Sequence, residues 1–153
     1  MRVRDAMTSR AETIGPDETL REAAHRMKDL DVGALVVCDR DHEIGILTDR
    51  DIVVRCVAEG RDPAAARVRS AMTPQVIECC EDDELEAAAT SMERGAVRRI
   101  AVVDAEKRLV GMLSVDDVAL RSPALAGEIV EHVRAPERPI QRGPWPWWEE
   151  PAR

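Results

Sequence analysis

The chain has 153 residues, a formal net charge of −8 and 44 % hydrophobic residues, so it can bury an aliphatic core although it contains no Phe or Tyr. The acidic balance argues against a protein that reads the phosphate backbone of nucleic acid, because such proteins usually present a basic face. It leaves room for a small anionic ligand held by local Arg residues or helix N-termini.

The sequence carries no sign of export or membrane insertion. The first residues, MRVRDAMTSR, lack the apolar stretch of a secretory signal, and no run approaches the length of a membrane span. We therefore expect a cytoplasmic protein that does not engage a membrane and whose cysteines are reduced. No C-x-x-C motif occurs and the histidines lack ligand spacing, which favours small buried residues over a metal site at Cys38, Cys56, Cys79 and Cys80.

One unit occurs twice along the chain. VRDAMT at 3–8 recurs as VRSAMT at 68–73, and VGALVVCD at 32–39 recurs as VRRIAVVD at 97–104, both at an offset of 65 residues. GILTDRD at 45–51 recurs as GMLSVDD at 111–117 at an offset of 66. Agreement in this order over about 50 positions indicates a duplicated unit.

Each copy is predicted to run β-α-β-β-α after a short helical lead-in that ends at Met-Thr. An extended piece (12–14 and 76–79) precedes an amphipathic helix, whose apolar stripe in the first copy comprises Leu20, Ala23, Ala24, Met27 and Leu30. Two apolar strands follow, at 34–38 with 44–47 and at 100–103 with 109–113, separated by turns that suit hairpins. A last helix begins in the Asp-rich segment and, in the first copy, ends at Gly60. This order predicts an α+β fold.

The remaining segments connect or follow the copies. The linker RDPAAAR is predicted to be helical from Pro63, and a further helix is predicted from Ser122-Pro123. We divide the chain into a first unit at 1–62, a second unit at 63–121, a C-terminal helix at 122–135 and a Pro/Trp-rich tail at 136–153. The tail contains PWPWW, for which three interpretations stay open: docking onto the protein's own helices or a dimer mate, recognition of a partner, or a poorly ordered terminus.

The repeated T/S-x-x-D motif has two interpretations. Thr48 with Asp51, and Ser114 with Asp117, stand where a strand gives way to a helix, so each pair can form a capping box without any ligand. A hydroxyl, free helix N–H groups and a carboxylate in one patch also suit a phosphorylated ribose. A glycine three residues before each hydroxyl indicates close approach of another group to the backbone.

The doubled M-T…G-h-h-[TS]-x-x-D pattern, over residues 3–120, resembles the CBS-domain pair, or Bateman module, here of the stand-alone type. The resemblance implies two units that pack through their sheets about a pseudo-two-fold axis, and clefts between them that bind AMP, ADP, ATP or S-adenosylmethionine. It also implies a flat homodimer and no required cofactor. It implies nucleotide-binding residues in two clefts: Thr48, Asp51, Ile46, Val97 and Arg98 in one, and Ser114, Asp117, Met112, Val32 and Gly33 in the other.

The copies differ where the first has Gly33-Ala34 and the second has Arg98-Arg99, positions at which the family often holds phosphate. Strand alternation favours only one of the two arginines reaching a given ligand. An ordinary solvated strand end is the alternative interpretation.

The leading hypothesis is therefore a regulatory sensor of adenosine-containing ligands that signals in trans to an effector protein. The alternative is a ligand-independent dimeric scaffold whose T/S-x-x-D motifs act only as helix caps. An enzyme is not expected, because no nucleophile–base constellation, P-loop or metal-ligand cluster occurs.

Overall fold

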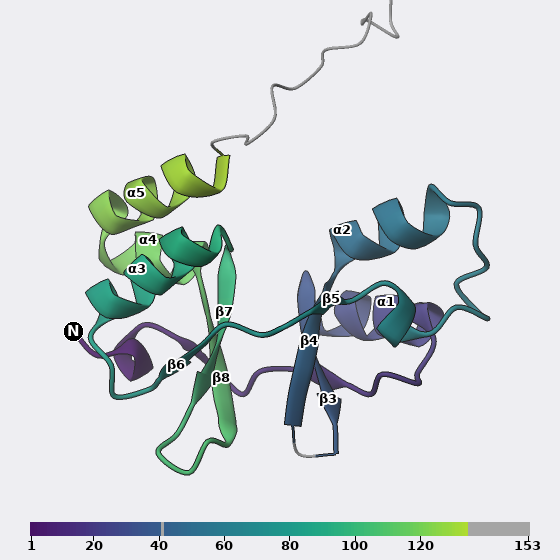
Figure 1. Ribbon diagram of the computed structural model, residues 1–153, viewed down its shortest axis with the longest axis horizontal. Coiled ribbons are helices and arrows are strands. Elements are labelled where there is room, and N and C mark those ends of the chain that lie inside the picture. Colours follow the sequence, from purple (N-terminus) through teal and green to yellow (C-terminus); the bar gives the residue numbers. More distant parts are fainter. Residues whose placement is uncertain (41, 135–153) are drawn as a thin grey trace, which may run out of the picture.

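A computed structural model describes residues 1–40 and 42–134, and it divides into two halves whose sheets lie toward the middle and whose helices lie outside (Figure 1). The predicted α+β fold is confirmed. The first half contains β2 (Thr13–Ile14), α1 (Leu20–Leu30), β3 (Ala34–Asp39), β4 (His42–Thr48), α2 (Asp49–Ile52) and η2 (Val53–Val57). The second half contains β6 (Glu78–Cys80), α3 (Leu85–Gly95), β7 (Arg99–Val103), β8 (Leu109–Ser114), α4 (Val115–Arg121) and α5 (Pro123–Arg134).

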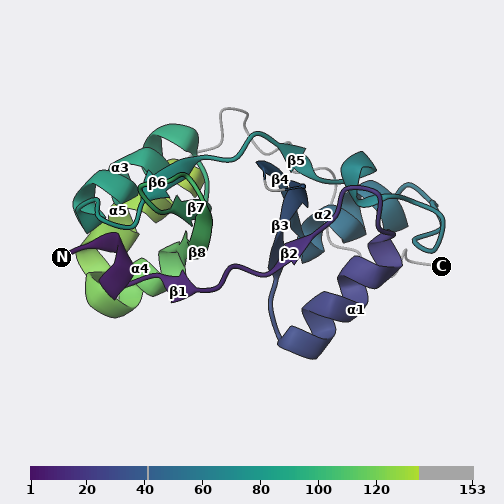
Figure 2. The same ribbon diagram turned by 90° about the horizontal axis from the view of Figure 1, so that it is seen from below.

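The two lead-ins are exchanged between the halves. The lead-in of the first copy, η1 (Val3–Asp5) and β1 (Thr8–Ser9), joins the second half, where β1 pairs antiparallel with β8. The lead-in of the second copy, η3 (Val68–Ser70) and β5 (Thr73–Pro74), joins the first half, where β5 pairs with β4. The sheets therefore have the orders β1-β8-β7-β6 and β2-β3-β4-β5, and Figure 2 shows the chain crossing between β1 and β2.

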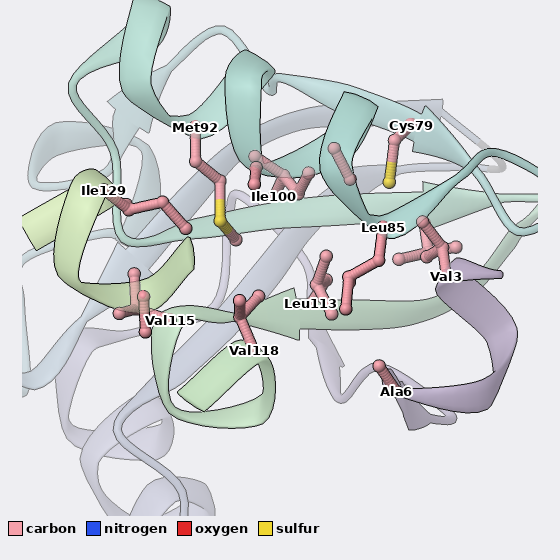
Figure 3. Packing of buried hydrophobic residues seen from close by; sticks show 14 residues of the cluster. Val3, Ala6, Cys79, Leu85, Met92, Ile100, Leu113, Val115, Val118 and Ile129 are labelled. Carbon is pink, nitrogen blue, oxygen red and sulfur yellow. The ribbon is translucent and has the colours of Figure 1, made fainter. Parts of the chain in front are cut away.

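The exchange follows from the apolar residues of the lead-ins. Val3 is fully buried among Leu85, Leu113 and other residues of the second half (Figure 3). Val68 is fully buried at the equivalent place in the first half, beside Leu20. Each hydrophobic core thus needs residues from both copies. The division of the chain after residue 62 describes the order of the repeats and stays a prediction.

The helix α1 forms where its stripe predicts. Thr19 and Glu22 build a reciprocal capping box, with Thr19 Oγ1 accepting from the Glu22 N–H at 3.1 Å. Leu20, Ala23 and Met27 are buried. The other two predicted stripe residues are not part of the core, since Ala24 is exposed and Leu30 is 44 % exposed.

The linker is not the helix that Pro63 predicts. Residues 63–65 form a turn, closed by bonds from the N–H groups of Ala65 and Ala66 to the carbonyl oxygen of Asp62. A helix does not continue because Ala66 is buried and its carbonyl oxygen accepts from the N–H of Leu20 at 2.9 Å. The linker is therefore a turn followed by the extended residue Arg67, which bridges Thr19 at the start of α1.

The predicted C-terminal helix is present as α5, which packs across α3 and α4. Ile129 is fully buried in the second core, and Ala126 is 6 % exposed (Figure 3 shows Ile129 beside Met92). The tail at 136–153 lies outside the described residues.

Candidate functional site

Two clefts lie between the halves and differ in size. The larger has a volume of about 440 Å³ and is lined by Ile46, Thr48, Asp49, Arg50, Asp51, Thr73, Gln75, Ile77, Val97, Arg98 and Arg99. The smaller has a volume of about 190 Å³ and is lined by Thr8, Arg10, Ala11, Glu12, Val32, Gly33, Ala34, Arg99, Met112, Ser114 and Asp117.

The predicted site residues gather in these two clefts in the two predicted sets. The larger cleft holds the whole first set: Ile46, Thr48, Asp51, Val97 and Arg98. The smaller cleft holds the whole second set: Val32, Gly33, Met112, Ser114 and Asp117. Arg99 lines both clefts. Their role in binding a nucleotide stays a prediction.

Both T/S-x-x-D motifs form capping boxes with the same geometry. Thr48 Oγ1 accepts from the Asp51 N–H at 3.1 Å, and Asp51 Oδ2 accepts from the Thr48 N–H at 2.9 Å. The corresponding distances between Ser114 and Asp117 are 3.1 Å and 2.9 Å. The capping interpretation is therefore correct for the geometry, and it leaves open whether the same groups also bind a ligand.

The two carboxylates differ in what else they accept. Asp117 Oδ2 also accepts from the Ser114 hydroxyl at 2.6 Å, and Asp117 Oδ1 accepts from the Thr8 hydroxyl at 3.3 Å. Asp51 Oδ1 has only the guanidinium of Arg55 nearby within the described residues, at 3.7 Å. The carboxylate in the larger cleft thus keeps more capacity to accept hydrogen bonds from a ligand.

The larger cleft also gathers the arginines. Arg98 and Arg99 both line it, since β7 begins only at Arg99 and strand alternation does not extend to Arg98. How many of the two reach a ligand stays a prediction. Within the described residues, neither Arg98 nor Arg99 forms an ion pair with the protein's own carboxylates. Arg50 is the third arginine in the lining, which also contains the two acidic residues Asp49 and Asp51.

The exchanged lead-ins complete both clefts, and sequence reasoning missed their contribution. β5 and the residues after it bring Thr73, Gln75 and Ile77 to the larger cleft. The glycines of the motif signal that another group approaches each strand closely, although they do not identify the segment that supplies it. A Cβ at Gly45 would lie 2.7 Å from the carbonyl oxygen of Thr73, and one at Gly111 would lie 2.6 Å from that of Thr8. The group that approaches each glycine is therefore the exchanged strand.

Metal binding, thiol reactivity and membrane insertion would each need a specific arrangement in the part of the chain that the structure describes. No group of three or more His, Cys, Asp or Glu side chains there is arranged to hold a metal ion. All four cysteines are free, and burial raises the pKa of the Cys79 thiol to about 12. No helix within residues 1–40 and 42–134 has both the length and the apolar character needed to cross a membrane.

Comparison with known proteins settles the family. The family model described as "CBS domain" matches residues 3–57 and again residues 68–123. The chain belongs to the CBS-domain family. Hypoxic response protein 1 of Mycobacterium tuberculosis is 36 % identical over 133 residues, which are 86 % of this chain and 91 % of that protein. An uncharacterized protein of Methanopyrus kandleri, MK0525, is 32 % identical over 123 residues, which are 80 % of this chain and 63 % of that protein.

Solved structures of other CBS proteins share the fold. The CBS domain protein TA0289 of unknown function from Thermoplasma acidophilum superposes with a TM-score of 0.78 at 26 % identity, covering 88 % of this chain and 77 % of that one. A hexameric CBS-CP12 protein from bloom-forming cyanobacteria superposes with a TM-score of 0.72 at 29 % identity, covering 80 % of this chain and 71 % of that one. Two CBS repeats in one chain, with the fold of stand-alone relatives, are thus established.

Proposed function

We propose that this CBS-domain protein is a regulatory sensor that binds an adenosine-containing ligand, of the AMP, ADP, ATP or S-adenosylmethionine class, in its larger cleft. The observation that carries the proposal is that two kinds of group meet in this cleft. One is the Asp51 carboxylate, whose Oδ1 accepts no hydrogen bond among the described residues; the other is Arg98 and Arg99, which form no ion pair there. Asp51 belongs to the first half, whereas Arg98 and Arg99 belong to the second. A ligand between them bridges the halves, and a partner protein reads the change in trans.

Each part of such a ligand has a counterpart in the lining. The Asp51 carboxylate accepts hydrogen bonds from the ribose hydroxyls. The guanidinium groups of Arg98 and Arg99 donate forked hydrogen bonds to phosphate oxygens. Ile46 and Val97 face the cleft as apolar side chains and flank the base.

The volumes of the two clefts favour the larger one as the nucleotide site. Pockets for small molecules measure about 300–1,000 Å³, and only the larger of the two, at about 440 Å³, lies in this range. The smaller cleft, at about 190 Å³, lies below it. We therefore expect one equivalent of nucleotide per chain.

Thermal unfolding with AMP, ADP, ATP and S-adenosylmethionine tests the proposal, followed by titration calorimetry on each ligand that shifts the transition. A ligand at 100 times its dissociation constant adds about 2.7 kcal/mol, which raises the melting temperature by about 8 °C for a chain of this size. The double variant Arg98→Ala/Arg99→Ala should lose the shift with phosphate-bearing ligands. The absence of any saturable shift would favour the alternative function, a ligand-independent scaffold.

Self-association is the second part of the proposal. Val54 and Leu120 occupy equivalent positions of the two copies, and they are 46 % and 84 % exposed. Paired exposed apolar residues of this kind suit contact between two copies of the chain. Light scattering after size exclusion should show a homodimer, and the double variant Val54→Lys/Leu120→Lys should be monomeric. A monomeric parent protein would contradict this part alone, since nucleotide binding is measured separately.

We assign no catalytic role to the protein. The clefts contain carboxylates that cap helices and arginines that suit anion binding, and neither set supplies a nucleophile with an adjacent base. Incubation of ATP with the protein should therefore leave the nucleotide unchanged, which chromatography of the mixture checks.

A further inference from the structure

A groove on the outer side of the first half is not explained by the nucleotide site. It has a volume of about 270 Å³ and is lined by Arg21, Ala24, His25, Lys28, Ile52, Val57 and Pro63. The floor is aliphatic, and Val57 is 60 % exposed there. Three of the lining residues, Arg21, His25 and Lys28, are basic. The groove thus combines an apolar surface with positive charge.

The internal repeat shows that the equivalent surface of the second half is covered. Ala24 is exposed on α1, whereas its equivalent on α3, Ala89, is 1 % exposed in the same buried cluster as Ala126 and Ile129 of α5. Val53 is 57 % exposed, whereas its equivalent, Ala119, is partly buried against that cluster. The described chain therefore supplies a cover for one helix pair and leaves the other open.

We propose that the Trp-rich tail of the same molecule, residues 136–153, docks in this groove. All Trp, Tyr and Phe residues of the protein, namely Trp145, Trp147 and Trp148, lie in that tail, and indole rings are stabilised by burial against apolar surface. The next residues, Glu149 and Glu150, complement the basic side of the groove. The tail as a whole has three Glu and three Arg, and its segment 145–150 is aromatic and acidic, which complements an aliphatic-basic groove.

The place where α5 ends and the length of the chain after it are consistent with docking on the first half. In both ribbon views the C-terminal end of α5 lies on the side that faces the first half (Figures 1 and 2). The 14 residues that follow Arg134, up to Trp148, span up to about 46 Å when extended, at about 3.3 Å per residue. A tether of this kind gives an effective concentration in the mM range, so that even weak docking is populated.

Intrinsic fluorescence tests the proposal directly, because every Trp is in the tail and no Tyr contributes. In the full chain, the emission should be blue-shifted and less quenched by acrylamide than in a free peptide of residues 136–153. Both effects should be independent of protein concentration, as expected for docking within one molecule. An emission and quenching constant equal to those of the peptide would overturn the proposal, and so would a blue shift that disappears on dilution, which indicates docking onto a second copy.

Substitutions in the groove locate the docked tail. Ala24→Glu and Val57→Lys change exposed positions, so the fold should persist by circular dichroism, while the quenching constant rises to that of the peptide. Leu30→Lys is the matched control, since it replaces an exposed apolar residue of α1 that does not line the groove and should leave the emission unchanged.

A charge exchange tests the acidic part of the tail. Lys28→Glu should weaken protection from acrylamide, and adding Glu149→Lys with Glu150→Lys should restore it. A blue shift that survives Ala24→Glu, Val57→Lys and Lys28→Glu would overturn docking in this groove.

Discussion

The substitutions Asp51→Asn and Asp117→Asn form a matched pair that separates helix capping from ligand binding. The two capping boxes have equal lengths, 2.9 Å and 3.1 Å for each pair of reciprocal bonds. The amide oxygen of Asn can still accept the backbone N–H bond, so each substitution removes the charge and keeps the shape. The two variants therefore change the helix caps in the same way, but each removes a charge from a different cleft.

The structure sets the expected sizes of the two effects. Loss of a negative charge in the first helical turn costs about 0.3–1 kcal/mol of stability, and Asp51 also loses an i,i+4 pair with Arg55, worth about 0.3–0.5 kcal/mol. At about 2–4 °C per kcal/mol, Asp117→Asn should thus melt about 1–4 °C lower and Asp51→Asn about 1–6 °C lower. Hydrogen bonds from ribose hydroxyls to a charged carboxylate are worth about 1.5–3 kcal/mol, which is about 10–150-fold in Kd.

Titration calorimetry with the nucleotide found by thermal shift measures the difference. Asp51→Asn should weaken binding by that factor, while Asp117→Asn should bind as the parent protein does, because Asp117 lies in the smaller cleft with both oxygens already bonded. Equal weakening in both variants would refute the assignment to the larger cleft. Unchanged binding in both would show that the carboxylates only cap their helices.

Three further outcomes follow from single contacts. Gly45→Ala should destabilise the protein by about 1–3 kcal/mol in chemical denaturation, because its Cβ would lie 2.7 Å from a backbone oxygen of β5 that cannot rotate away. Gly33→Ala, whose Cβ would lie 3.3 Å from a side-chain oxygen, should cost less. Cys79, whose pKa burial raises to about 12, should resist thiol reagents at pH 8 until the protein unfolds. The backbone N–H of Arg108 donates to Asp104 and lowers the pKa of that carboxyl. The ionised Asp104 therefore stabilises the fold above the ordinary Asp pKa, and this stabilisation is lost as the pH falls through the lowered pKa. Asp104→Asn should make stability depend less on pH in that range, as measured by acid denaturation.

Local pattern was enough to predict the elements, because their signals are short in range. The stripe of α1 and the alternation of apolar strands lie within single segments, and Thr19 with Glu22 marks a helix start three residues apart. The prediction of a helix in the linker was wrong. Pro63 favours a helical first turn locally, whereas the burial of Ala66 beside α1 determines the conformation of the linker. Tertiary packing overrides a local preference there.

The exchange of lead-ins could not be read from local pattern, because it depends on pairing over long separations. Thr8 pairs with Met112 and Pro74 pairs with Gly45, and no periodicity within either segment specifies those partners. The predicted residues line the two clefts, since the resemblance to a known family carried the long-range information, and their role in binding stays a prediction. Many of the lining residues that it did not name, such as Thr73 and Arg10, come from the exchanged lead-ins, whereas Asp49 and Arg50 come from the first turn of α2.

The unequal clefts follow from a difference of two residues on a duplicated frame. The caps are the same in both copies, but the first copy has Gly33-Ala34 where the second has Arg98-Arg99. The larger cleft receives both arginines, and the smaller receives only the shared Arg99 and the exchanged lead-in's Arg10. A phosphate that draws Arg99 toward the larger cleft therefore removes positive charge from the smaller one. Under the proposed function the two clefts are coupled through this side chain, so that occupancy of one changes the anion affinity of the other without any further contact.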